Sequence, residues 1–369
     1  MRILFAGGGT GGHLYPAIAI ADALVQRDGD AAQVVFVGTK DRLERRIVPQ
    51  AGYRLLSIAA RPMQRRSKSA LLGTMLINAR GVLQSFRFLL RERPEIIVAT
   101  GGYVCFPLVL AARMLNGVGL LRARIALLEP NAHPGLTNRL LAPIVDEIWG
   151  SFPQADVHFA GRYVHTGVPI RKELRALPSR AEAIARLGLD PHRRTLLAMG
   201  GSQGARSLND ALLGVLEKGA LPPGWQVLHL TGEGEYDRVR ARAAGAASQG
   251  LRAYLDDPAD AYAVADLLLA RAGASTLAEL VALGLPAILV PYPHAAEDHQ
   301  RANALAIERA GGALLLEDRT LDADALAAAL ARSCPPERLA AMRASVATLR
   351  GPEPIETILA RIAALVGRI

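Results

Sequence analysis

The stretch Arg271-Ala-Gly-Ala-Ser-Thr-Leu-Ala-Glu279 decides the fold of the second half of this chain. It continues through Leu280-Val-Ala-Leu-Gly-Leu-Pro286-Ala-Ile-Leu-Val-Pro291-Tyr-Pro-His294-Ala-Ala-Glu-Asp-His-Gln300-Arg-Ala-Asn303. The apolar run at residues 265–270, directly before it, predicts a short buried strand. Gly273 then makes a turn into a helix with Ser275 or Thr276 near its cap. The free N–H groups and partial positive charge at such a helix start suit a phosphate.

Glu279 and a second helix add polar groups that suit a nucleotide sugar. Glu279 lies about one turn into the first helix, where a carboxylate can accept two hydrogen bonds from a ribose diol. His299, Gln300 and Asn303 follow the next strand, and amides both donate and accept, as sugar hydroxyls require. An ordinary strand–helix–strand unit with a surface glutamate has the same spacing, so both interpretations stay open at this point.

A glycine-rich loop, Gly7-Gly-Gly-Thr10-Gly11-Gly12-His13, follows a predicted first strand at residues 3–6. It contains the spacing G-x-G-x-x-G of dinucleotide-binding loops, which expects an acid at the end of the second strand. The second strand, at residues 34–37, ends instead in Gly-Thr-Lys, so we expect no nicotinamide cofactor. We predict a backbone cradle for a pyrophosphate or a sugar and a helix that starts at Pro16. His13 lies at the lip of this cradle, as a catalytic base or as a mere helix cap.

The second half of the chain repeats this plan. A predicted strand at residues 195–199 leads into Gly200-Gly-Ser202-Gln-Gly-Ala-Arg206 and then into a helix. Ser202 and the free N–H groups beside it are candidates for binding phosphates, with a plain tight turn as the alternative. Because strand, glycine loop and helix open both halves, we predict an α/β protein with two similar doubly wound domains.

These blocks, with Leu128-Glu129-Pro130-Asn131, resemble glycosyltransferase family 28 and its bacterial peptidoglycan transferases. The resemblance implies two Rossmann-like domains facing across a cleft, the GT-B fold. It implies an acceptor- and membrane-binding domain at residues 1–165, joined by the C-terminal helix 355–369, and a donor-binding domain at 166–350. The family commonly has His-Glu-Gln-Asn where this chain has Leu-Glu-Pro-Asn, so only Glu129 and Asn131 carry over.

The resemblance also implies a reaction and its residues. N-acetylglucosamine would move from UDP-N-acetylglucosamine, with inversion, to the 4-hydroxyl of an undecaprenyl-diphosphate-linked muramyl-pentapeptide. His13 is the expected base and Glu129 the alternate. The residues expected to bind UDP-N-acetylglucosamine are Thr10, Gly11, Gly12, Asn131, Arg171, Ser202, Leu255, Ala274, Ser275, Thr276, Leu277, Ala278, Glu279 and Gln300. Two alternatives remain: a UDP-N-acetylglucosamine epimerase of the same architecture, and a non-catalytic sugar-nucleotide-binding protein.

The charge of the chain predicts an acidic partner. The formal net charge is +9, and eight basic residues but one acid lie between residues 61 and 93. Residues 69–90 predict a long helix with apolar residues at helical spacing. We expect this region to meet an anionic membrane surface, with a solvated basic face as the alternative. We expect no nucleic acid partner, because no binding motif is present. The predicted membrane and acceptor face comprises Arg65, Arg66, Lys68, Arg80, Arg87 and Arg91.

The remaining composition bounds compartment and metal use. The two cysteines, Cys105 and Cys334, favour neither a disulfide framework nor a zinc site and fit a reducing cytoplasm. We see no signal peptide and no apolar run long enough to span a bilayer, so we expect peripheral binding at the cytoplasmic face of the inner membrane. The Asp-x-Asp strings at residues 28–30 and 322–324 read as a turn and a helix cap, so we expect no metal.

Overall fold

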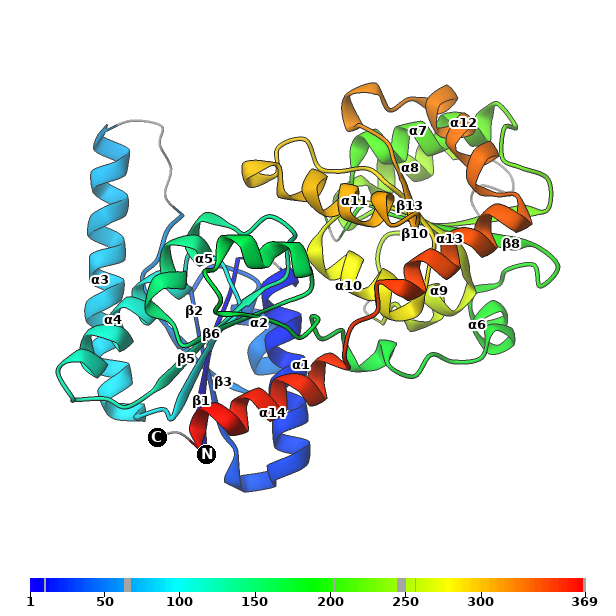
Figure 1. Ribbon diagram of the computed structural model, residues 1–369. Coiled ribbons are helices and arrows are strands. Elements are labelled where there is room, and N and C mark those ends of the chain that lie inside the picture. Colours follow the sequence, from blue (N-terminus) through cyan, green and yellow to red (C-terminus); the bar gives the residue numbers. More distant parts are fainter. Residues whose placement is uncertain (10, 63–67, 202, 244–249, 256, 368–369) are drawn as a thin grey trace. The chain divides into compact units, whose positions relative to one another are not determined.

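The computed structural model describes residues 1–9, 11–62, 68–201, 203–243, 250–255 and 257–367. Contacts divide the chain into two compact units, which are coloured along the sequence in Figure 1. The first comprises Met1–Ile170 with Gly351–Ile369, and the second comprises Arg171–Arg350. Each unit is an α/β structure with its own parallel sheet.

The first unit has a sheet of seven parallel strands in the order β3-β2-β1-β4-β5-β6-β7. Leu4 in β1 pairs with Val35 on one side and with Ile97 on the other. Strands buried on both faces need continuous apolar runs, which β1 and β4 supply. The strands are β1 (Arg2–Ala6), β2 (Gln33–Gly38), β3 (Arg54–Ser57), β4 (Ile96–Ala99), β5 (Arg124–Glu129), β6 (Glu147–Gly150) and β7 (Tyr163–His165).

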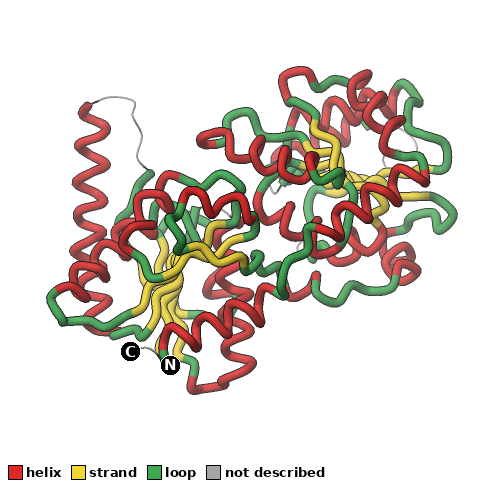
Figure 2. The backbone as a smooth tube through the Cα atoms, viewed as in Figure 1, coloured by secondary structure: helices red, strands yellow, loops and turns green. Residues whose placement is uncertain are grey.

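Helices cover both faces of this sheet, as the tube in Figure 2 shows. The helix pairs α1 with α14 and α3 with α4 pack together. A core cluster that includes Leu89, Val104, Leu108 and Leu127 lies where α3 and α4 meet the sheet. The helices are α1 (Gly11–Asp28), α2 (Glu44–Gln50), α3 (Lys68–Glu92), α4 (Cys105–Gly117), α5 (Leu136–Leu141) and α14 (Pro354–Val366).

The second unit has a sheet of six parallel strands in the order β10-β9-β8-β11-β12-β13. These strands are β8 (Arg194–Met199), β9 (Trp225–Leu230), β10 (Leu251–Arg252), β11 (Ala265–Ala270), β12 (Ala287–Leu289) and β13 (Ala313–Leu315). Its helices are α6 (Arg180–Leu187), α7 (Arg206–Glu217), α8 (Tyr236–Arg242), α9 (Ala259–Val264), α10 (Ala274–Leu283), α11 (His299–Arg309), α12 (Ala323–Ser333) and α13 (Pro336–Thr348). The predicted architecture of two doubly wound α/β domains is confirmed.

Two local predictions were wrong or incomplete. Helix α1 starts at Gly11 rather than at Pro16, because Gly11 and Gly12 take helical conformation and Pro16 lies inside the helix. The strands β3, β6, β7 and β13 were not predicted. Three of the missed strands lie at a sheet edge, where one side needs no partner and the apolar run is short.

Both Asp-x-Asp strings have the local roles that we predicted. The Asp322 carboxylate caps α12 by accepting from Ala325 N at 2.8 Å. Asp28 ends α1 and pairs with Arg27, and the short 3₁₀ turn Gly29–Ala31 follows. Among the described residues, no group of three His, Cys, Asp or Glu side chains is placed to hold a metal ion.

Candidate functional site

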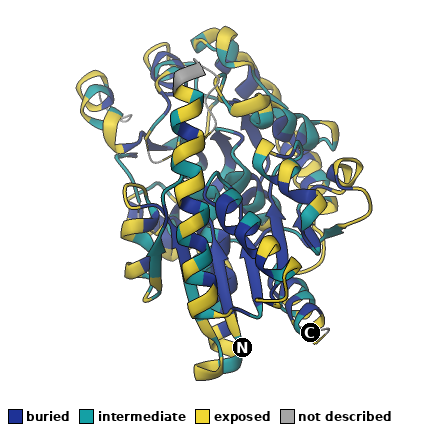
Figure 3. Ribbon diagram, turned by 90° about the vertical axis from the view of Figure 1, so that its left-hand side faces the viewer, coloured by how far each residue is buried: buried dark blue, intermediate teal, exposed yellow. Residues whose placement is uncertain are grey.

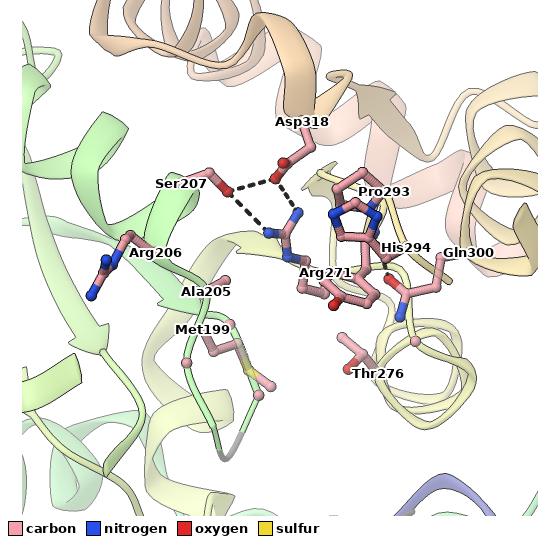
Figure 4. A pocket seen from close by; sticks show the side chains of 15 residues that line it. Met199, Ala205, Arg206, Ser207, Arg271, Thr276, Pro293, His294, Gln300 and Asp318 are labelled. Atoms are coloured by element: carbon pink, nitrogen blue, oxygen red, sulfur yellow. Dashed lines mark hydrogen bonds and ion pairs between the residues drawn. The ribbon is translucent and has the colours of Figure 1, made fainter. Parts of the chain in front are cut away.

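A cavity of about 640 Å³ opens in the second unit at the carboxyl ends of β8 and β11. These two strands are neighbours in the sheet, and the strand order reverses between them. Parallel α/β sheets bind ligands at such a topological switch point. The glycine loop after β8 and the turn at Gly273 form part of its wall (Figure 4). The lining residues are Met199, Gly200, Gly201, Gly204, Ala205, Arg206, Ser207, Arg271, Gly273, Thr276, Tyr292, Pro293, His294, Gln300 and Asp318.

A hydrogen-bonded cluster centred on Arg271 joins three loops at this cavity, as the dashed lines in Figure 4 show. The guanidinium donates to Asp318 Oδ1 at 2.5 Å and to Ser207 Oγ at 3.0 Å. It also donates to the carbonyls of Val290 and Pro291, each at 3.2 Å. Local sequence patterns do not predict this cluster, because the partners of Arg271 lie 47 and 64 positions away. An arginine directly after a buried strand was the available signal.

The N-terminus of α10 faces the cavity with its backbone donors uncapped. Gly273 is the N-cap residue, and no side chain among the described residues caps the helix; Ser275 and Thr276 lie in its first turn, near the cap as predicted. Thr276 also lines the cavity. Ser275 Oγ is buried and has no hydrogen-bond partner among the described residues. Unfilled donors at the start of a ten-residue helix make this wall suited to an anion.

Glu279 lies behind the cavity wall, and only 4% of it is exposed. Its Oε2 accepts from the hydroxyl of Tyr262 at 2.5 Å, and its Oε1 is 3.7 Å from Arg171 Nε. Burial raises the pKa of Glu279, while the charge of Arg171 and the bond from Tyr262 oppose that shift. The structure therefore brings the predicted site residues Glu279 and Arg171 together directly, and it adds Tyr262, which was not predicted. The ribose contact of Glu279 stays a prediction.

The start of α11 supplies amide groups beside the same cavity. Gln300 lines the cavity, and its Oε1 accepts from Tyr292 N at 2.9 Å. Asn303 is buried and donates to Ala272 O at 3.2 Å, so it ties α11 to the turn after β11. Glu297 and Asp298, directly before α11, have φ values of 52° and 54°. Two successive left-handed residues without glycine store backbone strain of the kind found at ligand loops.

In the first unit, His13 lies at the carboxyl ends of β1 and β4, the equivalent position of that sheet. Its Nδ1 is 2.9 Å from the carbonyl oxygen of Thr100. A carbonyl only accepts, so Nδ1 carries the hydrogen and the neutral ring has its lone pair on Nε2. Gly101 permits this placement, because a Cβ there would lie 2.5 Å from Nδ1.

Glu44 is a fully buried carboxylate that supports the glycine loop from beneath. Its Oε2 accepts from Gly9 N at 3.2 Å, and its Oε1 accepts from Thr39 N at 2.9 Å and from Thr39 Oγ1 at 2.7 Å. The second strand lacks a terminal acid that could bind a ribose. Glu44, five residues after Thr39, is an acid, but its carboxylate hydrogen-bonds to Thr39 and to the glycine loop inside the protein.

Glu129 ends β5 and is 1% exposed. Its Oε1 accepts from Asn131 N and Nδ2, at 2.9 and 3.0 Å. Its Oε2 accepts from Gly135 N at 3.1 Å and from Asn138 Nδ2 at 2.9 Å. Burial raises the pKa of Glu129 to about 7, although these hydrogen bonds oppose the shift. The carboxylate therefore organises the loop from Asn131 to Gly135.

The long helix α3 presents an apolar stripe to solvent, and Figure 3 shows exposed residues along its length. Leu72, Leu76 and Leu83 are 60%, 65% and 68% exposed. Arg80, Arg87 and Arg91 are also exposed. Gln84, on the same helix, is partly buried and accepts from Ala59 N at 2.7 Å. No helix in the described ranges is both long and apolar enough to cross a membrane.

Several residues that were predicted for the site lie outside the described ranges or do not line the cavity. Thr10, Ser202, Arg65 and Arg66 lie outside the described residues, as does the side chain of Lys68. Leu277 is buried within α10. Leu255 follows β10 and is not among the residues that line the cavity.

Comparison with known proteins identifies the family. Residues 3–149 match the glycosyltransferase family 28 N-terminal domain, and residues 195–357 match the glycosyltransferase family 28 C-terminal domain. The chain belongs to glycosyltransferase family 28. The resemblance stated from the sequence is therefore confirmed, and the protein is a glycosyltransferase.

Individual relatives of this family 28 chain match it over its whole length. It is 41% identical over 379 residues to the UDP-N-acetylglucosamine--N-acetylmuramyl-(pentapeptide) pyrophosphoryl-undecaprenol N-acetylglucosamine transferase of Desulforudis audaxviator (strain MP104C), covering 100% of this chain and 99% of that protein. The protein of the same name from Chlorobium luteolum (strain DSM 273 / BCRC 81028 / 2530) is 41% identical over 371 residues and covers 98% of each.

Among solved structures, a crystal structure of Acinetobacter baumannii MurG has a TM-score of 0.77 at 24% identity, covering 98% of this chain and 99% of that one. This likeness supports the GT-B fold. The epimerase and the non-catalytic binding protein are not favoured, because the full-length relatives at 41% identity are named as transferases.

Proposed function

We propose that this family 28 glycosyltransferase moves N-acetylglucosamine from UDP-N-acetylglucosamine to the 4-hydroxyl of the muramyl sugar of undecaprenyl-diphospho-N-acetylmuramyl-pentapeptide. The names of the full-length relatives support this pair of substrates. The observation that carries the donor assignment is the cavity at the β8 and β11 ends, where the α10 N-terminus meets a glycine loop. Such a wall suits a diphosphate, and Gln300 beside it suits a sugar.

The donor's leaving group needs stabilisation in the transition state. The acceptor oxygen forms a bond to the anomeric carbon while the bond from that carbon to the β-phosphate oxygen of UDP breaks. Negative charge then grows on UDP, next to the uncapped backbone donors of α10. We assign Arg271 a supporting role, because its donors are occupied by Asp318, Ser207 and two carbonyls.

The acceptor hydroxyl must lose a proton, and we assign its removal to His13. The bond from Nδ1 to the Thr100 carbonyl leaves the basic lone pair of the neutral ring on Nε2. Glu129 is the weaker candidate, because it is buried and both of its oxygens accept hydrogen bonds from its own loop. We therefore treat Glu129 as a positioning residue.

The acceptor carries a lipid tail, and we assign α3 to the membrane. Its exposed leucines stand beside exposed arginines, the combination that binds an anionic bilayer surface at the level of the headgroups. We propose that the protein binds peripherally at the cytoplasmic face of the inner membrane, where the lipid-linked acceptor is reached without leaving the bilayer.

The test is acceptor-dependent consumption of the donor by the full-length protein. UDP release is measured with UDP-N-acetylglucosamine in the presence and absence of a short-chain lipid-diphospho-muramyl-pentapeptide. We expect UDP and a β-linked disaccharide product only when the acceptor is present. Conversion of the donor without any acceptor would support an epimerase instead. A parallel assay in EDTA should retain activity, and restoration by added Mg²⁺ or Mn²⁺ after a loss would overturn the metal-free assignment.

A further inference from the structure

Tyr262 is a buried side chain near the cavity, and the proposed reaction assigns it no role. It belongs to α9 and is 2% exposed. Its hydroxyl is 2.5 Å from Glu279 Oε2 and 3.7 Å from the sulfur of Met199. Met199 lines the cavity, so the hydroxyl lies directly behind the cavity wall. Tyr262 therefore links an element outside the cavity to a carboxylate that we predict to be a donor ligand.

The hydroxyl has one hydrogen, and the carboxylate is the stronger of its two acceptors. A hydrogen bond from a hydroxyl to a carboxylate is stronger than one to a thioether sulfur. It occupies one lone pair of Oε2 and limits the rotation of the carboxylate. Oε1 has an ion-pair contact with Arg171 at 3.7 Å and accepts no hydrogen bond within the described part of the chain. Glu279 is thus held from two sides with acceptor capacity left over.

We propose that Tyr262 is a positioning residue that orients Glu279 to read the ribose hydroxyls of the donor nucleotide. This inference rests on the proposed function, because it takes UDP as the ligand of the cavity. Without the tyrosine hydroxyl, the carboxylate would keep its charge partner but lose its fixed orientation. Affinity should then fall for nucleotides that carry ribose hydroxyls and should hold for those that lack them.

The experiment compares two probes, UDP and 2′,3′-dideoxy-UDP, by titration calorimetry. The proteins are the parent, Tyr262→Phe, Glu279→Gln and the matched control Tyr236→Phe. Tyr236 lies in the same unit, on α8, in a small cluster with Leu213, Val239 and Leu251. The parent should prefer UDP by about 10-fold or more, and both Tyr262→Phe and Glu279→Gln should lose most of that preference. Tyr236→Phe should keep it.

The dideoxy probe separates positioning from general damage. Tyr262→Phe should bind 2′,3′-dideoxy-UDP as the parent does, which shows that the cavity is intact. An equal loss of affinity for both probes would reduce Tyr262 to a packing residue. A Tyr262→Phe variant with the parent's preference, beside a Glu279→Gln variant that has lost it, would overturn the inference and leave the proposed function standing. Preference kept in Glu279→Gln as well would overturn both the inference and the ribose assignment.

Discussion

At the scale of single residues, His13 and Glu129 are the two candidates for the catalytic base, and their surroundings differ. His13 has a fixed ring orientation through the Thr100 carbonyl. Glu129 is enclosed by four donors from three residues of its own loop. A group that removes a proton must reach the substrate, whereas a group that shapes a loop need not. Substitution of His13 should therefore change kcat, whereas substitution of Glu129 should change stability and its pH dependence.

His13→Ala should lower kcat by about 10²-fold or more, the usual scale for a lost general base. UDP affinity should be nearly unchanged, because the donor cavity lies in the other unit. The measurement is steady-state kinetics with a soluble acceptor together with UDP calorimetry. His192→Ala, at an exposed site of the second unit, is the control. A variant with full kcat would reduce His13 to a structural residue of the glycine loop.

Glu129→Gln should remove one component of the pH dependence of stability. Folding raises the pKa of this carboxyl from its ordinary 4.5 to about 7. Between these values the unfolded chain has lost the proton and the folded protein keeps it. The free energy of unfolding therefore decreases as pH rises through this window, by up to about 1.4 kcal/mol per pH unit for one group.

The check on Glu129 is denaturant unfolding of parent and variant between pH 4.5 and 8. The parent-minus-variant difference should decrease steadily up to about pH 7 and then level off. Glu95→Gln serves as the control, since Glu95 Oε1 accepts from Arg2 N at an exposed site of the same unit. Parallel curves for parent and Glu129→Gln would contradict the assignment.

At the scale of elements, α3 docks on the first unit through two small residues together with apolar side chains such as Leu89, Val82 and Phe86. Gly81 and Ser85 are buried on this side, and a Cβ at Gly81 would lie 2.1 Å from the Ala59 carbonyl oxygen. Asn78 brackets Arg61 by accepting from its N at 3.0 Å and donating to its O at 3.1 Å. Close packing on the chain before the helix leaves the leucines on the outside.

Two glycines of α3 offer a matched pair that tests this docking. Gly81→Ala should destabilise the first unit by about 1–3 kcal/mol, because the added methyl overpacks the contact with Ala59. Gly73→Ala meets nothing within 4 Å and should be neutral or stabilising by up to about 1 kcal/mol, since alanine favours the helix. Thermal melts of both variants give the comparison. Equal melting temperatures would mean that α3 does not pack as described.

At the scale of the whole molecule, the net charge is +9, and part of the positive charge lies on the exposed face of α3. Exposed arginines on α3 alternate with exposed leucines, and each cation near an anionic surface contributes about 1 kcal/mol. The triple variant Arg80→Glu, Arg87→Glu and Arg91→Glu should abolish flotation with anionic vesicles. It should spare UDP binding and activity on a short-chain soluble acceptor, because the donor cavity belongs to the other unit.

The control for the membrane prediction carries the same change of charge elsewhere. Arg240→Glu, Arg309→Glu and Arg338→Glu alter exposed arginines of the second unit. This control should still float, and flotation of both proteins should weaken as salt rises. If the α3 variant floats as well as the parent does, this helix is not the membrane-binding element.

The two-domain α/β architecture and the positions of the glycine loops could be predicted from local sequence patterns. Apolar runs such as those of β1 and β11 specify buried parallel strands, and the glycines after β1 and β8 mark the loops at their carboxyl ends. Glu279 and Gln300 followed from their spacing along helices. These inferences hold because hydrophobic period and turn chemistry are local properties of the chain.

Contacts between side chains that are distant in sequence became apparent from the folded structure alone. Tyr262 reaches Glu279 across 17 positions, and Arg271 reaches Ser207 across 64. Glu44 is turned inward onto Gly9, 35 positions earlier. The exposure of Leu72, Leu76 and Leu83 on α3 is also set by tertiary packing, because Gly81, Ser85 and Leu89 make the inner contacts of this helix. Side-chain partners depend on which strands are neighbours in the sheet, and the local hydrophobic periodicity of the sequence does not predict that order.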